Sequence, residues 1–246
     1  MEKPIINLLW LYPDLLNLHG ERGSVQAFVR AGENLGVQVN VKRVEDFNDK
    51  IDFDSADLIM LLPGELKELQ FIKPALEKQE KELCNYIENR GYIIAIGTTG
   101  MLFGKKTVRE NGDVFEGLGI LDIEGKERKY IRGDDIHFRI NSSKQEIFGS
   151  QIQAVDCTAS NPLGTILFGH GNNGEGNEGA VYKNLIFTNC LGPVFVKNPW
   201  WTESIVKDII LKKYLGVEQK KENALENASF DSCLKFTKRK PEYIEK

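Results

Sequence analysis

Residues 92–104 have the sequence YIIAIGTTGMLFG, and this stretch decides the fold. Residues 92–96 are a short, continuous apolar run rich in isoleucine, which predicts a strand buried on both faces. Gly97 follows at once, a second glycine comes three residues later, and residues 101–103 can open a helix. Strand, sharp turn and helix are the layout of a nucleophile elbow, whose apex residue stands at the carboxyl end of a central strand. Such an apex normally carries Ser or Cys, but here it is Gly97.

Strand and helix patterns alternate in the chain before this stretch. Further strands are expected at residues 5–10, 37–41 and 56–62. Ser24 is expected to cap a helix that ends at Gly36, and Pro74 is expected to open another helix that ends at Gly91. This alternation favours a parallel, doubly wound sheet, in which ligands bind at the carboxyl ends of the strands.

The second half of the chain has a different character. Between residues 117 and 187, short strand-like runs are separated by Gly, Asn and Asp, and we expect them to be antiparallel additions to the same core. The segment 171–179, GNNGEGNEG, is so polar that it is expected to be a surface loop. We therefore predict one α/β domain over residues 1–216, followed by a charged tail over 217–246 that is partly helical or loose.

Composition excludes several classes of function. The 246 residues are 41% hydrophobic and 28% charged, as in an ordinary globular protein, and the net charge of −4 gives no case for nucleic acid or an anionic membrane as partner. The four cysteines lack CxxC spacing, so neither a zinc site nor a disulfide framework is indicated, and no metal or cofactor is expected. No apolar run reaches the ~20 residues of a spanning helix and no signal peptide is visible, so we expect a cytoplasmic protein.

Four segments together resemble one known family. They are LYPDLLNLHGERGS at 11–24, EGLGILD at 116–122, GNNGEGNEGAVYKN at 171–184 and GPVFVKNP at 192–199. The chain resembles the class I glutamine amidotransferases of the cobyric-acid-synthase type, in particular the glutaminase subunit of lipid II isoglutaminyl synthase. The resemblance covers residues 5–215 and implies a flavodoxin-like α/β fold with flanking helices. It also implies a Mur-ligase-like partner subunit that amidates the glutamate of peptidoglycan precursors.

The resemblance breaks at the residues that carry the family's chemistry. A Cys thiolate attacks the side-chain amide of glutamine, and a His base returns a proton to the departing ammonia. The family's C-G-G-Y-Q-L-L-G-like elbow corresponds to GTTGMLFG at 97–104, which puts Gly97 at the nucleophile position. Its T-Y-L-H-G-P-like segment corresponds to TNCLGP at 188–193, which puts Leu191 at the base position. The resemblance therefore implies that no catalytic pair is intact.

Other positions of the family's site have counterparts in this chain. The strand GSQIQAV at 149–155 corresponds to a G-Y-E-I-H-M-G-like strand, with Gln151 and Gln153 in place of its acid and imidazole. The amides of Gly64 and Thr98 fall where the family places its oxyanion hole. An anion or a carbonyl oxygen, such as that of glutamine or a related small amide, is expected to bind there.

Several residues have two interpretations each. Thr98 or Thr99 could act as a substitute nucleophile, or their hydroxyls could simply bond to the turn backbone. Cys190 could face the position of the family's catalytic site, or it could be a small buried side chain in a strand. Cys84 is expected in the core. The pair Trp200-Trp201 could anchor a partner or pack the last helix on the sheet.

The chain has three histidines, and none has the spacing of a metal site. His19, His137 and His170 are each expected to be solvated or hydrogen-bonded residues rather than ligands or bases. Three hypotheses of function follow: a non-catalytic subunit of an amidating enzyme, a working amidohydrolase with a different nucleophile, and a module that binds a small carboxylate or amide.

Overall fold

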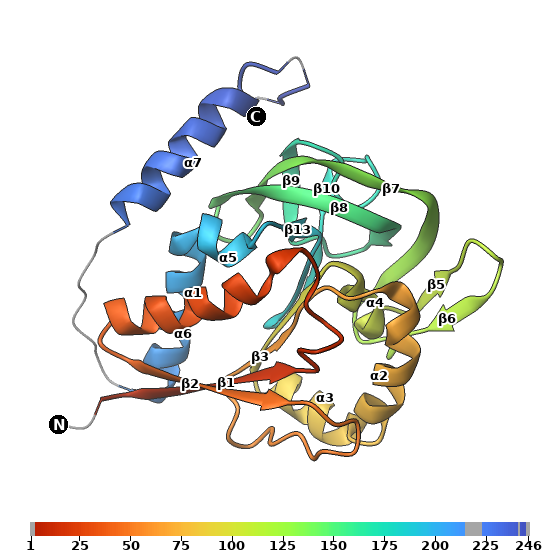
Figure 1. The fold of residues 1–246 in the computed structure, drawn as a ribbon, viewed down its shortest axis with the longest axis vertical. Coiled ribbons are helices and arrows are strands. Elements are labelled where there is room, and N and C mark those ends of the chain that lie inside the picture. Colours follow the sequence, from red (N-terminus) through yellow and green to blue (C-terminus); the bar gives the residue numbers. More distant parts are fainter. Residues whose placement is uncertain (1–2, 215–222, 241, 245–246) are drawn as a thin grey trace.

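The computed structural model describes residues 3–214, 223–240 and 242–244, and two sheets with flanking helices make up its fold (Figure 1). The strand order of the first sheet is β11-β12-β4-β3-β1-β2. Its strands are β1 (Ile5–Leu11), β2 (Gln38–Val44), β3 (Leu58–Leu61), β4 (Tyr92–Ile96), β11 (Ala180–Tyr182) and β12 (Leu185–Thr188). All of them run parallel except the edge strand β11, which is antiparallel to β12. The predicted α/β fold with a mostly parallel sheet is confirmed.

Helices cover both faces of this sheet because successive strand residues point to opposite sides. Leu8 and Trp10 of β1 pack into a cluster with α1 (Arg22–Asn34) and α6 (Pro199–Lys213), whereas Leu9 and Leu11 pack into a second cluster with α2 (Leu69–Glu77) and α3 (Glu80–Glu88). Figure 1 shows these two pairs of helices on opposite sides of the strands. Short helical segments complete this half: η1 (Leu18–Gly20), η2 (Leu66–Glu68), η3 (Gly97–Thr99), α4 (Gly100–Phe103) and α5 (Val194–Lys197).

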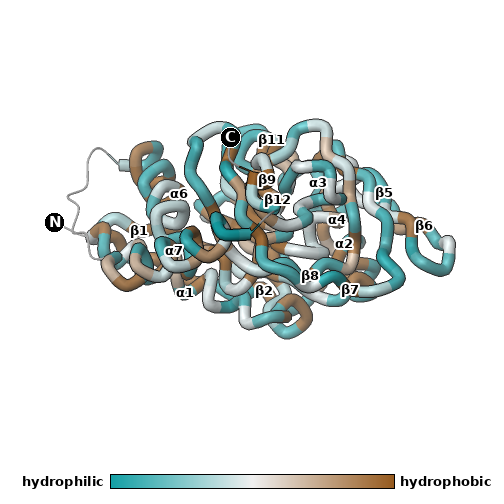
Figure 2. The backbone as a smooth tube through the Cα atoms, turned by 90° about the horizontal axis from the view of Figure 1, so that it is seen from above, coloured by the Kyte–Doolittle hydropathy of each residue, from teal (hydrophilic) through white to brown (hydrophobic). Residues whose placement is uncertain are grey.

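Most of the expected antiparallel additions form a second sheet of their own, whereas the run at 180–182 is β11 at the edge of the first sheet. The second sheet contains β5 (Lys106–Val108), β6 (Val114–Glu116), β7 (Ile123–Ile140), β8 (Glu146–Ala159), β9 (Gly164–Phe168), β10 (Asn177–Glu178) and β13 (Cys190–Leu191). Its inner residues, such as Phe138 and Ile147, lie in the same hydrophobic cluster as Ile94 and Ile96 of β4, so the two sheets share a core as predicted. The outer part of β7 is exposed, and Figure 2 shows much of the backbone there as hydrophilic.

Two predicted helix starts are wrong. α1 begins at Arg22 rather than after Ser24, whose hydroxyl instead donates a hydrogen bond to Glu21 at 2.9 Å. Pro74 lies inside α2 rather than at its start, because the apolar spacing that anchors the helix already begins at the buried Leu69. The chain then breaks between Glu77 and Glu80, so the single helix expected up to Gly91 is two helices.

The structure corrects the expectation for Cys84 and decides between the two interpretations of the Trp200-Trp201 pair. Cys84 is only half-buried on α3, not a core residue. Both tryptophans pack within the chain: Trp201 is buried against Phe195 with ring centroids 4.7 Å apart, and Trp200 stacks edge-on against Phe230 at 4.6 Å. The packing interpretation of the Trp pair is therefore the correct one.

Phe230 belongs to α7 (Ala224–Thr237), which contacts α5 and β8. Figure 1 shows α7 at the edge of the fold. This helix is the described part of the predicted tail, together with residues 223, 238–240 and 242–244. Residues 217–222, 241 and 245–246 of that tail lie outside the described residues.

Candidate functional site

Gly97 is the apex of a turn at the carboxyl end of β4, which lies between β3 and β12 in the sheet. Its φ of +66° is in the left-handed region, which costs an L-residue ~1–2 kcal/mol and costs glycine almost nothing. A Cβ built on Gly97 would lie 3.1 Å from Pro63 Cβ and 3.9 Å from Leu191 Cδ2. The structure therefore brings Gly97 and Leu191 together, although they are far apart in the sequence.

The second glycine of the turn has a packing role. A Cβ on Gly100 would lie 2.1 Å from Phe187 Cδ2, so the first residue of α4 must be glycine for the helix to lie against β12. This close approach fixes how α4 leaves the turn. The position of the apex is therefore determined by packing between the helix and the neighbouring strand.

The two threonines of the turn bond to backbone carbonyls. Thr98 Oγ1 donates a hydrogen bond to Gly64 O at 2.6 Å and lies 3.4 Å from Gly64 N. Thr99 is fully buried, and its Oγ1 lies 2.9 Å from Ile96 O and 3.1 Å from Leu61 O. These contacts match the interpretation in which both hydroxyls stabilise the turn. The Thr98 amide stands in the first turn of η3, where backbone N–H groups have no intrahelical acceptor.

A small cavity opens beside the apex, and the room it offers to a bound group is about 10 Å³, about that of one water molecule. Its lining residues are Gly97, Thr98, Met101, Ile152, Gln153, Ala154, Val155 and Asn189. No thiol, imidazole or carboxylate belongs to these described lining residues. Gly64 and Leu191 adjoin the lining through Thr98 and Gly97 but are not part of it. The cavity can therefore offer the Thr98 amide to a ligand, whereas the Thr98 hydroxyl and the amide nitrogens of Gln153 and Asn189 donate within the chain.

Gln151 and Gln153 belong to a buried polar network behind the cavity. Gln151 Nε2 lies 2.6 Å from both Gly171 O and Gln153 Oε1, and Gly171 N donates to Gln151 Oε1 at 3.2 Å. Gln153 Nε2 in turn donates to Asn172 O at 2.8 Å. Both glutamines therefore hold the start of the 171–179 segment against β8.

The other end of that segment is held by a buried carboxylate. Glu178 is fully buried, and its Oε1 accepts hydrogen bonds from the Thr188 hydroxyl at 2.8 Å and from Asn189 N at 2.7 Å. Burial raises the pKa of Glu178, although these hydrogen bonds favour its ionised form. Asn189 Nδ2 also donates to Asn172 Oδ1 at 3.0 Å, so the network reaches a side chain that lines the cavity.

The prediction that 171–179 is a surface loop is thus wrong for its two ends. Asn172 and Glu178 are buried, whereas Gly174 and Glu175 between them are exposed. Sequence reasoning missed this network because Gly, Asn and Glu are equally typical of solvated turns. The available signal was that the segment lies next to a buried strand at each end.

Cys190 and Leu191 form the short strand β13, which pairs with β8. Cys190 is fully buried, and burial raises the pKa of its thiol well above the usual value, with the neighbouring Glu178 adding to the shift. The structure thus places Cys190 as a small buried side chain. After Leu191, the Gly192 amide donates to Glu21 Oε1 at 2.5 Å, and burial raises the pKa of that carboxyl.

The three histidines lie away from the cavity. His137 is fully buried, with Nε2 3.2 Å from Glu146 Oε2, and burial lowers its pKa. His170 Nε2 lies 3.1 Å from Asp156 Oδ1, and His19 is exposed in η1. Within the described residues, no group of three His, Cys, Asp or Glu side chains could hold a metal ion. Among the residues that the structure describes, no helix is long and apolar enough to cross a membrane.

Comparison with known proteins adds four findings. Residues 7–198 match the CobB/CobQ-like glutamine amidotransferase domain. The chain is 28% identical over 217 residues to the lipid II isoglutaminyl synthase (glutamine-hydrolyzing) subunit GatD of Streptococcus pneumoniae, covering 85% of this chain and 82% of that protein. It is also 28% identical over 215 residues to GatD of Staphylococcus aureus, covering 84% of this chain and 85% of that protein. A chain of PurLQS from Thermotoga maritima shares the fold with a TM-score of 0.54 at 13% identity, over 86% of this chain and 99% of that one.

Proposed function

The chain belongs to the CobB/CobQ-like glutamine amidotransferase family, and on that premise we propose that it is a non-catalytic relative of a glutaminase subunit. It acts as a structural or regulatory subunit beside a Mur-ligase-like amidating enzyme in the cytoplasm, in the modification of cell-wall precursors. The similarity to two proteins named as subunits of lipid II isoglutaminyl synthase supports this role.

The observation that carries the proposal is the pairing of Gly97 with Leu191. Glutamine hydrolysis by a thiolate needs a nucleophile at the elbow and a base within hydrogen-bond reach. Here a glycine without a side chain faces a leucine, with 3.9 Å between the built Cβ and Leu191 Cδ2. Because nucleophile and base act as a unit, the absence of both removes the basis of ordinary glutaminase chemistry.

The candidate substitutes are poorly placed for catalysis. Thr98 and Thr99 direct their hydroxyls to backbone carbonyls, and no described histidine lines the cavity to act as their base. Cys190 is fully buried with a raised thiol pKa, which opposes formation of the reactive thiolate. These contacts favour the non-catalytic subunit over an amidohydrolase that uses a different nucleophile.

A synthetase that uses free ammonia can keep such a subunit for stability after hydrolysis is lost. We propose one further role for the remaining backbone site, the binding of glutamine or a related small amide, for which the cavity would have to widen. The Thr98 amide is a neutral donor that suits the oxygen of a carboxamide, whereas the amide nitrogens of Gln153 and Asn189 already donate within the chain. Calorimetric titration with glutamine tests this role separately from complex formation.

The decisive experiment is co-expression with the Mur-ligase-like chain of the same organism, followed by size-exclusion chromatography and labelling with 6-diazo-5-oxo-norleucine. We expect a stable complex that carries no adduct when peptides are mapped by mass spectrometry. An adduct on Thr98, Thr99 or Cys190 would show that chemistry survives by a new route. A chain that remains monomeric beside the ligase, with no adduct, would instead favour a binding module.

A further inference from the structure

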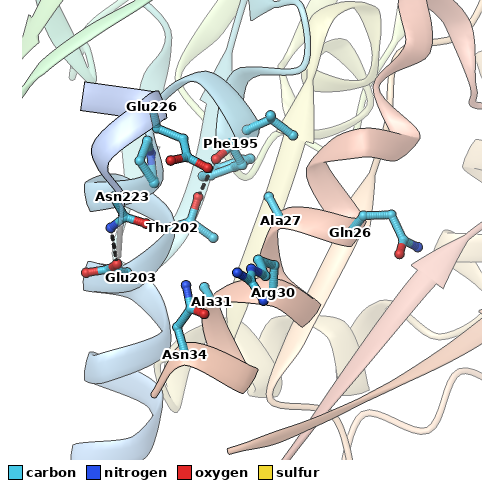
Figure 3. A pocket seen from close by; sticks show the side chains of 12 residues that line it. Gln26, Ala27, Arg30, Ala31, Asn34, Phe195, Thr202, Glu203, Asn223 and Glu226 are labelled. Carbon is cyan, nitrogen blue, oxygen red and sulfur yellow. Dashed lines mark hydrogen bonds between the residues drawn. The ribbon is translucent and has the colours of Figure 1, made fainter. Parts of the chain in front are cut away.

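A second, larger cavity lies between α1, α5, α6 and the first turn of α7 (Figure 3). It is half open to solvent and offers about 210 Å³ to a ligand, less than the sites that take drug-sized molecules, so it suits only a small ligand. None of its described lining residues belongs to the cavity beside Gly97. A ligand here would therefore occupy a site distinct from the one inherited with the family fold.

The floor of this cavity is apolar and has room because its helix residues are small. Ala27 and Ala31 lie one turn apart on α1, and Phe195 of α5 completes the floor. The ring of Phe195 is held in place by Phe28 at 4.9 Å and by Trp201 at 4.7 Å. The apolar surface is thus rigid and already formed, so a ligand would not have to order it.

The two sides of the cavity carry opposite charges. Figure 3 shows Arg30 and Asn34 on α1 at one side, and Glu203 of α6 with Glu226 of α7 at the other. Arg30 is 68% exposed and forms a long ion pair of 3.8 Å with Glu33. Its guanidinium therefore keeps donors for a second carboxylate.

Glu203 is the most buried charge at the cavity, with a side chain only 8% exposed. One of its oxygens accepts a hydrogen bond from Asn223 Nδ2 at 2.5 Å, and the other lies 3.5 Å from Lys207 Nζ. A carboxylate offers about four lone-pair sites, so capacity remains for one more donor. A ligand ammonium would therefore be a third partner of Glu203, beside Asn223 and Lys207.

We propose that this cavity binds a free α-amino acid with an apolar side chain. The ligand carboxylate pairs with Arg30, the ammonium with Glu203 and Glu226, and the side chain rests on Ala27, Ala31 and Phe195. The cavity presents a cation from α1 and carboxylates from α6 and α7, so a ligand that carries both charges can pair with both, whereas a simple anion or a simple amine can pair with only one of them. This is a binding site additional to the proposed subunit role and does not depend on it.

The test is calorimetric titration of the full chain with leucine, N-acetyl-leucine and leucinamide. The acetyl group removes the ammonium charge and the amide removes the carboxylate, while the side chain is unchanged. We expect leucine to bind, and each blocked form to bind at least about tenfold more weakly, which corresponds to ~1.4 kcal/mol. Equal binding of leucine and either blocked form, or no binding of leucine at millimolar concentration, would overturn the proposal.

Two pairs of variants locate the site. Arg30→Gln and Glu203→Gln are expected to weaken leucine binding at least about tenfold, since each removes one charge of the recognised pair. Arg22→Gln on the same helix and Glu80→Gln on α3 change the same charges at exposed positions outside the cavity and should bind like the parent. Arg30 is exposed, so its variant keeps the test valid even if Glu203→Gln fails to fold. Unchanged binding by a folded Arg30→Gln would exclude this cavity as the site.

Discussion

Gly97→Ala tests directly whether the apex of the β4 turn is a strained position that only glycine occupies cheaply. At φ +66° a Cβ costs ~1–2 kcal/mol, and the loss of glycine's freedom in the unfolded chain returns about 0.4–1 kcal/mol. The new methyl group would also lie 3.1 Å from Pro63 Cβ, a contact that forces a small backbone shift or an overpacking cost of about 1 kcal/mol. We expect the free energy of unfolding to fall by about 1–3 kcal/mol.

Gly20→Ala is the matched control, because Gly20 has a φ of +73° and no atom within 4 Å of its built Cβ. It carries the backbone cost without the contact, so Gly97→Ala should destabilise the chain by about 1 kcal/mol more. Both variants are compared by urea denaturation followed by circular dichroism, with equal m-values as the check on the comparison. An equal loss of unfolding free energy in the two variants would refute the crowding at the apex, and a stabilised Gly97→Ala would refute both the strain and the crowding.

Three further predictions address the site and the fold. Gly97→Cys combined with Leu191→His is expected to show glutamine hydrolysis above either single variant in an ammonia-release assay, and no activity in a folded double variant would mean that the cavity itself has diverged. The stability of the chain should fall as the pH drops below about 6.5, because burial lowers the pKa of His137 and the unfolded chain takes up a proton that the folded one resists. His137→Gln removes that contribution. The difference in the free energy of unfolding between the parent chain and this variant should therefore narrow from pH 7.5 to 5.5. A constant difference would contradict this prediction. Gln151→Leu leaves both backbone groups of Gly171 unpaired and should cost about 2–4 kcal/mol by urea denaturation, against less than about 0.5 kcal/mol for an exposed control, Gln38→Leu.

The elements that hold the apex could be predicted from the sequence because their signals are local. An apolar run from 92 to 96 followed by Gly97 leaves few alternatives to a buried strand and a turn. Pro74 misled the prediction, since proline is most common at a helix start, although the buried Leu69 and Ile72 upstream show helical spacing. Strand β12 was not predicted separately, because its four residues are too few to show the alternation by which a strand is recognised.

The long-range part of the site could not be predicted in this way. Glu178 is buried because the β11–β12 hairpin brings it under the Thr188 hydroxyl and the Asn189 amide, a result of strand pairing that no local pattern encodes. The same holds for Gln151, whose only local signal is a polar residue in an alternating strand. Polar residues that become buried partners are indistinguishable in sequence from polar residues that face water.

The shape of the turn at Gly97 is held by other residues and does not depend on a side chain at the apex. Gly100 lies against Phe187, Thr99 bonds back to Ile96, and Thr98 bonds across to Gly64, so every fixed point of the turn lies outside the apex. Glycine at residue 97 therefore relieves backbone strain in the turn and removes none of the contacts that hold it. By the same reasoning, a Cys placed at residue 97 would stand at the carboxyl end of β4, beside Pro63 and Leu191. The shape of the turn and any chemistry at its apex are thus set by different residues in this chain.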